Sequence, residues 1–218
     1  MVKKADRLQH IVKTALGLAA ESRWSSLSLR EFAEAADVSP SEMYTLYPSK
    51  ISILKAYFRS VDAAMLETKF AFDPEDSPRD RLFDVLMRRF DALAEDRDGV
   101  LSILAELRRD PVSALCLSAG MCESMRWMLE TARIPASGSK GRLTVKGLVG
   151  LWLATLRVWE RDESADMAQT MAALDKNLRR AERLRSMLPS SPRRSRRDKE
   201  PPPDASPACP RQPDQRAS

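Results

Sequence analysis

Apolar residues recur at helical spacing along most of the chain, and no stretch alternates with the two-residue period of a strand. The first periodic segment carries Leu8, Ile11, Val12, Ala15 and Ala19 on one face. Later helices are predicted over residues 79–95, 99–109, 111–133, 143–160 and 165–188, with a loop over 134–141. The pattern therefore predicts an all-α protein of about nine helices.

Two short helices with marked starts are predicted between residues 28 and 47. Ser28 with Glu31, and Ser39 with Glu42, have the spacing of a capping box. In that motif the serine oxygen accepts a hydrogen bond from the backbone N–H three residues on, and the glutamate returns to the N–H of the serine. Each pair therefore fixes the residue at which a helix begins.

A sharp turn separates these two helices. Asp37 stands at the turn, where aspartate tolerates the left-handed conformation better than most residues do. Pro40 suits the first position of the second helix, and Pro48 ends that helix. Ser49 is placed to cap a long third helix, with Lys50 in its first turn. This is the layout of a helix-turn-helix, which places its second helix in the major groove of DNA.

The second helix of this unit would contact DNA through the face that turns away from the core. Met43 and Leu46 are predicted to face inward. The candidates for contacts to base edges are Ser41, Tyr44 and Thr45. The candidates for contacts to the phosphate backbone are Tyr47 and Lys50. Arg30 and Ser39 are two further candidates for DNA contacts. Geometry alone leaves a second interpretation open, a three-helix bundle that binds nothing.

Residues 28–50 resemble the TetR family of bacterial one-component transcription regulators. The family pattern is T/S-L-R-E-I-A-x-A-A-G-V-S, followed by a recognition helix that ends in Y-x-x-F/Y-x-x-K. The matching residues are Ser28, Leu29, Arg30, Glu31, Phe32, Ala33, Ala35, Ala36, Val38, Ser39, Tyr44, Tyr47 and Lys50. Asp37 replaces the usual turn glycine, and Leu46 stands where the family often has histidine or an aromatic residue.

The resemblance implies a homodimeric regulator, with repression as the expected direction, that binds double-stranded operator DNA under the control of a small apolar effector. It implies a DNA-binding domain over residues 1–50 and a helical effector-binding and dimerisation domain over 51–188. The pocket residues that we assign on this basis are Met65, Leu104, Met121, Met125, Trp152 and Leu156. The dimer-interface residues, on the last two helices, are Leu148, Leu151, Trp159, Met171, Leu174 and Leu178.

A second resemblance covers residues 148–184. This segment is similar to the C-terminal end of the ubiquinone-biosynthesis accessory proteins, which share the TetR fold but bind lipid and a partner hydroxylase. The matching residues are Trp159, Asp162, Ser164, Asp166, Thr170, Leu174 and Asp175. The alternative that follows is a lipid-binding accessory protein that has lost specific DNA binding and whose partner is a membrane surface.

The net charge of +5 is concentrated at the two ends of the chain. Residues 1–60 hold nine basic and six acidic side chains, and residues 189–218 hold seven and four. Excess positive charge in the predicted DNA-binding domain suits a polyanionic partner. Residues 189–218 are rich in Pro, Ser and Arg, and we predict a disordered tail there.

Enzyme signatures are missing from the sequence. His10 is the only histidine and has no nucleophile pattern beside it, and the seven glycines form no phosphate-binding loop. The three cysteines lack metal-ligand spacing, and we expect Cys116 and Cys122 to be buried thiols. We therefore expect no catalysis, no metal and no cofactor. The N-terminus lacks the apolar segment of a signal peptide, so a cytoplasmic location is expected.

Overall fold

The computed structural model describes residues 4–187. The helices are α1 (Lys4–Glu21), α2 (Leu29–Ala35), α3 (Pro40–Leu46), α4 (Lys50–Glu67), α5 (Pro78–Ala94), α6 (Arg97–Leu107), α7 (Pro111–Thr131), α8 (Gly138–Trp159) and α9 (Ala168–Met187). Within the described residues there are no strands, and the all-α prediction is confirmed. The predicted tail over 189–218, with Cys209, lies outside the described residues.

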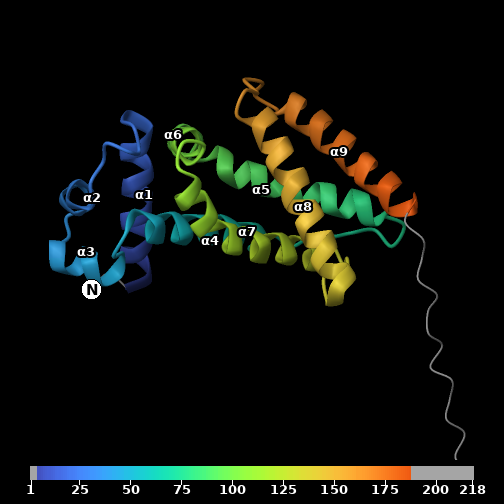
Figure 1. Ribbon diagram of the computed structural model, residues 1–218, viewed down its shortest axis with the longest axis horizontal. Coiled ribbons are helices and arrows are strands. Elements are labelled where there is room, and N and C mark those ends of the chain that lie inside the picture. Colours follow the sequence, from blue (N-terminus) through green and yellow to red (C-terminus); the bar gives the residue numbers. More distant parts are fainter. Residues whose placement is uncertain (1–3, 188–218) are drawn as a thin grey trace, which may run out of the picture.

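The first three helices form a small bundle at one end of the molecule, and α4 leads from it into the larger group of helices (Figure 1). Phe32 of α2, Met43 of α3 and Ile53 of α4 are buried in the core of this bundle. The Trp24 ring stacks on Phe32 with 5.3 Å between ring centroids. Burial of these apolar side chains fixes α2 and α3 against α1 and α4.

The helix starts predicted from the sequence are present in the structure. Ser28 Oγ accepts from the N–H of Glu31 at 3.2 Å, and the Glu31 carboxylate accepts from the N–H of Ser28 at 2.7 Å, so this capping box is complete. Ser39 Oγ likewise accepts from the N–H of Glu42 at 3.2 Å. The Glu42 carboxylate instead pairs with Arg7 of α1 at 2.7 Å, which ties α3 to α1.

The turn between α2 and α3 has the predicted backbone conformation. Asp37 has a φ of 52°, in the left-handed region that the sequence analysis assigned to it. Ser49 caps α4 together with Ser52, whose N–H donates to Ser49 Oγ at 3.1 Å. The path from α2 to α4 is therefore determined by local sequence signals.

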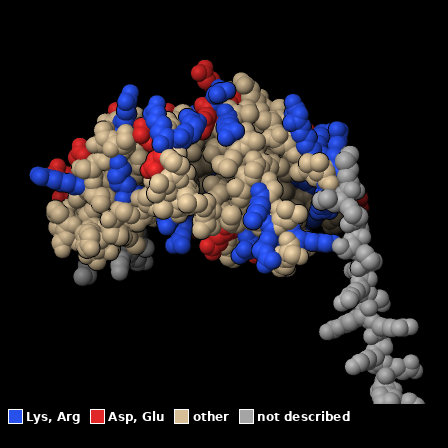
Figure 2. Space-filling view, in the orientation of Figure 1, with Lys and Arg blue, Asp and Glu red and all other residues tan. Residues whose placement is uncertain are grey.

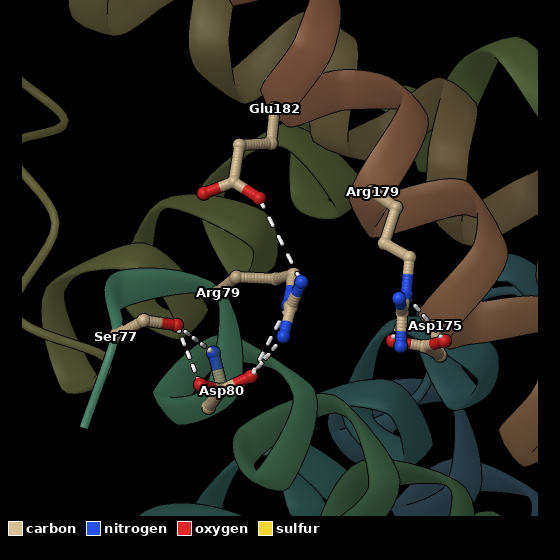
Figure 3. A network of polar contacts seen from close by, with 6 residues as sticks. All are labelled: Ser77, Arg79, Asp80, Asp175, Arg179 and Glu182. Atoms are coloured by element: carbon tan, nitrogen blue, oxygen red, sulfur yellow. Dashed lines mark hydrogen bonds and ion pairs between the residues drawn. The ribbon is translucent and has the colours of Figure 1, made fainter.

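The larger group of helices is built around α8, which packs against α7 and α9, while α9 also packs against α5. At the surface between α5 and α9, the guanidinium of Arg79 lies 3.8 Å from the Glu182 carboxylate (Figure 3). Arg79 also pairs with Asp80 in the first turn of α5, and Arg179 pairs with Asp175 within α9. Only the Arg79–Glu182 pair joins the two helices, and exposed pairs of this kind contribute little to stability.

The predicted loop over residues 134–141 was partly wrong, because α8 begins at Gly138, inside it. Ser137 has the extended backbone of a residue that precedes a helix. Gly141 then packs on the backbone of Ala136, where a Cβ atom would approach the Ala136 carbonyl carbon to 2.2 Å. The small residues that suggested a loop instead allow the first turn of α8 to fold tightly over the preceding segment.

A buried arginine, Arg89, lies in the core of the larger helical unit. Arg89 of α5 is 1% exposed, and its Nε donates to Asp62 of α4 at 2.9 Å. Ser124 of α7 donates to the same Asp62 oxygen at 2.8 Å, and the guanidinium lies 4.4 Å from the ring centroid of Trp152 in α8. Four helices therefore meet at one buried ion pair.

A search of the described residues found no helix long and apolar enough to cross a bilayer. The apolar segment of α8 packs against α7 and α9.

Candidate nucleic-acid interface

The outward face of α3 carries the side chains that the sequence analysis assigned to base edges. Ser41 and Thr45 are exposed, and Tyr44 is 72% exposed although it is aromatic. Thr45 Oγ1 donates to the Ser41 carbonyl at 2.9 Å, which leaves the hydroxyl oxygen as an acceptor. On the opposite side of the helix, Met43 is buried. The helix is thus anchored on one face and open on the other.

Two further candidates flank this face. Ser39 is occupied as the cap of α3, so its hydroxyl oxygen holds the helix start. Arg30 lies on α2 and pairs with Glu34 one turn later at 2.8 Å. Both side chains of that pair are largely exposed, and solvent screens such surface pairs strongly, so they contribute little. The Arg30 guanidinium can therefore leave Glu34 for a stronger acceptor at small cost.

Tyr47 and Lys50, assigned to the phosphate backbone from the sequence, are directed into the protein instead. Tyr47 is buried, and its hydroxyl donates to the Leu8 carbonyl at 3.2 Å. Burial also raises the pKa of its phenol. Tyr47 therefore holds α3 against α1, and its ring is not available on the outer surface.

The Lys50 ammonium is enclosed by the loop between α1 and α2. It donates to the carbonyls of Trp24 and, at 2.8 Å, Leu27, and lies 5.1 Å from the Trp24 ring centroid. Burial lowers its pKa, against the opposing effects of Glu106 and Glu31. This correction follows from the three donors of an ammonium, which the loop carbonyls engage within the chain. Lys50 thus stabilises the loop between α1 and α2 through these hydrogen bonds.

A small hollow of about 210 Å³ lies between the start of α2 and the outer face of α3. It is lined by Leu29, Arg30, Pro40, Met43 and Tyr44. Leu29 is half-buried and Met43 fully buried, so the floor of the hollow belongs to the packed core. The hollow forms because the first turns of α2 and α3 lie side by side, and no pattern in the sequence predicts it.

The helix-turn-helix segment has few charges that attract phosphate. Between Ser28 and Lys50 there are two basic and four acidic side chains, a formal charge of −2. In Figure 2 the surface over α3 is mostly uncharged, while Lys and Arg gather over α9 at the other end. Any specific binding by α3 must therefore depend strongly on contacts to the bases.

Solved structures with the same arrangement of helices identify the fold, although a scan of protein-family models and a search of curated proteins found no match. A TetR transcriptional regulator from Nitrosomonas europaea ATCC 19718 is 26% identical, with a TM-score of 0.66 over 80% of this chain and 97% of that chain. The chain has the TetR-family fold. The resemblance inferred from residues 28–50 is thereby confirmed, and it extends across the larger group of helices.

Two more distant structures share this TetR fold. A TetR transcriptional regulator from Rhodococcus sp. RHA1 is 20% identical, with a TM-score of 0.59 over 81% of this chain and 97% of that chain. A TetR-family regulator from Streptomyces coelicolor is 18% identical, with a TM-score of 0.55 over 83% of each chain. At these identities the likeness concerns the fold alone.

None of the six residues assigned to an effector pocket lines the hollow beside α3 or a second hollow, which lies between α6 and α8. Met65, Met125, Trp152 and Leu156 are buried in the packed core, and Leu104 and Met121 are half-buried. The Trp152 ring is stacked on Phe90 with 4.2 Å between centroids. The second hollow, of about 590 Å³, is instead lined by Leu101, Arg108, Arg157, Glu160 and Arg161, and three of these residues are basic.

Four of the six residues assigned to the dimer interface are buried within the single chain. These are Leu148, Trp159, Leu174 and Leu178, while Leu151 and Met171 are half-buried. The exposed residues of α8 instead include Leu143, Gly147, Gly150, Leu153 and Ala154, together with the basic residues Arg142, Lys146 and Arg157. The correction has a simple cause, because helical periodicity marks an apolar face without showing whether its own chain or a partner covers it.

The first half of α7 presents a second apolar surface that sequence reasoning missed. Val112 and Leu115 are 69% and 73% exposed, and Trp127 further along is 50% exposed. Cys116 is also exposed, so the expectation of a buried thiol was wrong for it, while Cys122 is half-buried. The signal was present in the run PVSALCLSAG, which is apolar on every side of a helix.

The residues behind the second resemblance form the turn between α8 and α9. Asp162 is buried and accepts from the N–H and the hydroxyl of Thr170 at 2.8 and 2.7 Å, and from the N–H of Ser164 at 3.1 Å. Arg97 donates to the carbonyls of Trp159 and Asp162 at 2.8 and 2.7 Å. These contacts give Asp162, Ser164 and Thr170 a structural role within the folded chain, and this role requires neither a lipid nor a partner protein.

We predict that Asp162→Asn lowers the free energy of unfolding by about 1–3 kcal/mol, because an amide cannot accept all of these hydrogen bonds. Burial works to raise the pKa of Asp162, but the hydrogen bonds from Ser164 and Thr170 outweigh it and lower the pKa to about 2. The folded chain thus resists protonation that the unfolded chain accepts near pH 4. The stability from Asp162 is therefore complete above about pH 4 and lost as the pH falls toward 2.

Urea denaturation of the wild-type chain and of Asp162→Asn, each between pH 3 and 7, measures this contribution. Asp166→Asn is the matched control, since Asp166 is exposed and accepts one backbone hydrogen bond, from Ala168. A difference between wild type and Asp162→Asn that does not shrink in acid would contradict the assignment.

Proposed function

We propose that this chain is a TetR-like one-component transcriptional regulator that binds operator DNA as a homodimer. The geometry of α3 carries the proposal. The helix is capped at its start, held from within by Met43, and presents Tyr44 and its neighbours to solvent. A helix presented in this way can enter the major groove with its side chains against base edges. The TetR fold, shared at 26% identity with a transcriptional regulator, supports the same function.

Two recognition helices require two copies of the chain. We assign the contact between the copies to the exposed apolar faces of α7 and α8, which pack side by side. Leu115 and Leu153 are exposed there, and Gly147 and Gly150 would let a second backbone approach closely. Repression and control by a small ligand belong to the same proposal and rest on the TetR fold. A cytoplasmic location follows, since the DNA would lie there.

Selection of duplexes from a random library by the full chain would test this function. We expect enrichment of an inverted repeat whose half-sites lie about one helical turn apart, because a two-fold dimer repeats the same contacts at that spacing. Enrichment of a single half-site would count against the dimer. If the selected duplexes share no consensus sequence, the proposed function as a whole is contradicted.

We predict that Tyr44→Ala weakens binding to the selected duplex about ten- to hundredfold, because the loss of recognition at one base pair of a specific site typically costs about 1–3 kcal/mol and the dimer carries two copies of the residue. The side chain is 72% exposed, so its removal should leave the fold intact. Fluorescence anisotropy measures the affinity, and circular dichroism verifies the helical content. Leu184→Ala, which truncates an exposed apolar side chain on α9, is the control and should bind like wild type.

A further inference from the structure

The inner wall of the hollow between α2 and α3 is fixed by the fold. The Pro40 ring sets the first turn of α3, and Leu29 occupies the first position of α2, within its capping box. Met43 is 2% exposed and forms part of the core beneath. Tyr44 and Arg30 are exposed and form the outer rim. The inner wall therefore keeps its shape, while the side chains of the rim can adjust to a bound group.

The size and chemistry of the hollow restrict what it can hold. Drug-sized ligands occupy pockets of roughly 300–1,000 Å³, and this hollow measures about 210 Å³. Four of its five lining residues are Leu, Pro, Met and Tyr, and only Arg30 brings a charge. A small apolar group fits it better than an effector molecule or a phosphate does.

The DNA major groove offers one apolar group to a recognition helix. Base edges there present hydrogen-bond donors and acceptors, apart from the C5 methyl group of thymine. The same methyl group is present on 5-methylcytosine. Because the segment from Ser28 to Lys50 has a formal charge of −2, α3 itself attracts phosphate weakly, and its own contribution to binding must come mainly from the bases.

We infer that the hollow formed by Leu29, Pro40, Met43 and Tyr44 recognises the C5 methyl group of a pyrimidine in the major groove, which is thymine in unmodified DNA. This inference rests on the proposed function, since it requires α3 to lie in the groove. Arg30 at the rim would then donate to the base or phosphate next to that pyrimidine.

The test replaces thymine by uracil, which removes the methyl group and leaves base pairing unchanged. In the duplex obtained by selection, each thymine of a half-site is changed in turn, in both half-sites together. We expect one position at which affinity falls about three- to tenfold per half-site, because burial of one methyl group contributes about 0.8 kcal/mol or more. Equal affinity for thymine and uracil at every position, with specific binding retained, would overturn this inference and leave the proposed function standing.

Two protein variants tie the effect to the hollow. Leu29→Ala enlarges the hollow, so the preference for thymine over uracil should fall toward one, with folding verified by circular dichroism. Leu66→Ala makes the same change on α4, outside the hollow, and should keep the full preference. A preference that persists in Leu29→Ala would overturn the assignment to this hollow.

A third duplex distinguishes the two sources of the methyl group. At the sensitive position, a 5-methylcytosine–guanine pair is compared with a cytosine–guanine pair. Tighter binding to the methylated pair supports recognition of the methyl group itself. Equal binding to both pairs would overturn it, because a hollow that holds the C5 methyl group should hold it on either pyrimidine. If no duplex is bound specifically, this inference and the proposed function fail together.

Discussion

Replacing Arg89 by alanine should lower the free energy of unfolding by about 3–5 kcal/mol, because it leaves a largely buried carboxylate without its partner. Arg89 is 1% exposed and pairs with Asp62 at 2.9 Å. The substitution also removes the guanidinium that covers the Trp152 ring. Since Asp62, Arg89 and Trp152 belong to three different helices, the loss should affect the whole larger unit. Chemical denaturation followed by circular dichroism measures it.

Arg88 provides the matched control. It is the neighbouring arginine, but it is exposed and pairs with Asp91 at 3.6 Å on the surface of α5. Arg88→Ala should change stability by less than about 0.5 kcal/mol. The double variant Arg89→Met with Asp62→Leu should be more stable than the sum of the two single effects predicts, because it removes both charges. Strict additivity of the two changes would contradict a direct ion pair.

Replacing Gly99 by alanine should destabilise the chain by about 1–3 kcal/mol, because overpacking forces backbone shifts. Gly99 lies where α6 crosses α1, and a Cβ atom there would stand 2.5 Å from the Leu16 carbonyl oxygen. That neighbour is backbone, so it cannot move aside as a flexible side chain would. The contact between α1 and α6 joins the small N-terminal bundle to the larger unit. The variant should therefore weaken this contact.

Gly17→Ala tests whether the crossing itself is responsible. Gly17 follows Leu16 on α1, and nothing lies within 4 Å of the position that its Cβ atom would take. Alanine should stabilise this helical position by about 1 kcal/mol, because it restricts the unfolded chain. Thermal denaturation of the two variants should shift in opposite directions. A loss of similar size in both would contradict the close approach at Gly99.

The features that could be predicted from the sequence are those determined locally. The Ser28–Glu31 capping box, the left-handed Asp37 and the proline at the start of α3 each depend on residues within a few positions of one another. Exposure of Tyr44 followed from the assignment of Met43 and Leu46 to the core, which leaves Tyr44 on the outer part of the helix. Such signals were sufficient for the helix-turn-helix and for the all-α class.

The features that could not be predicted depend on distant partners. Tyr47 and Lys50 each combine an apolar stem with a polar end. Only the fold shows that the Tyr47 hydroxyl donates to the Leu8 carbonyl and that the Lys50 ammonium donates to the loop carbonyls. Leu148 and Trp159 lie on apolar faces, but periodicity does not show which surface covers them. The sequence does contain a signal for the burial of Arg89, because this residue falls in register with the apolar face of α5.

Sequence-specific recognition by α3 is tested by fluorescence anisotropy with the selected duplex and a scrambled duplex at 50 and 200 mM salt. We expect the selected duplex to be bound at least about a thousandfold more tightly, as specific sites generally are. This preference should survive the higher salt concentration, because the recognition segment carries a formal charge of −2 and its contacts are mainly to bases. Weak binding that is equal for both duplexes and lost at 200 mM salt would contradict it.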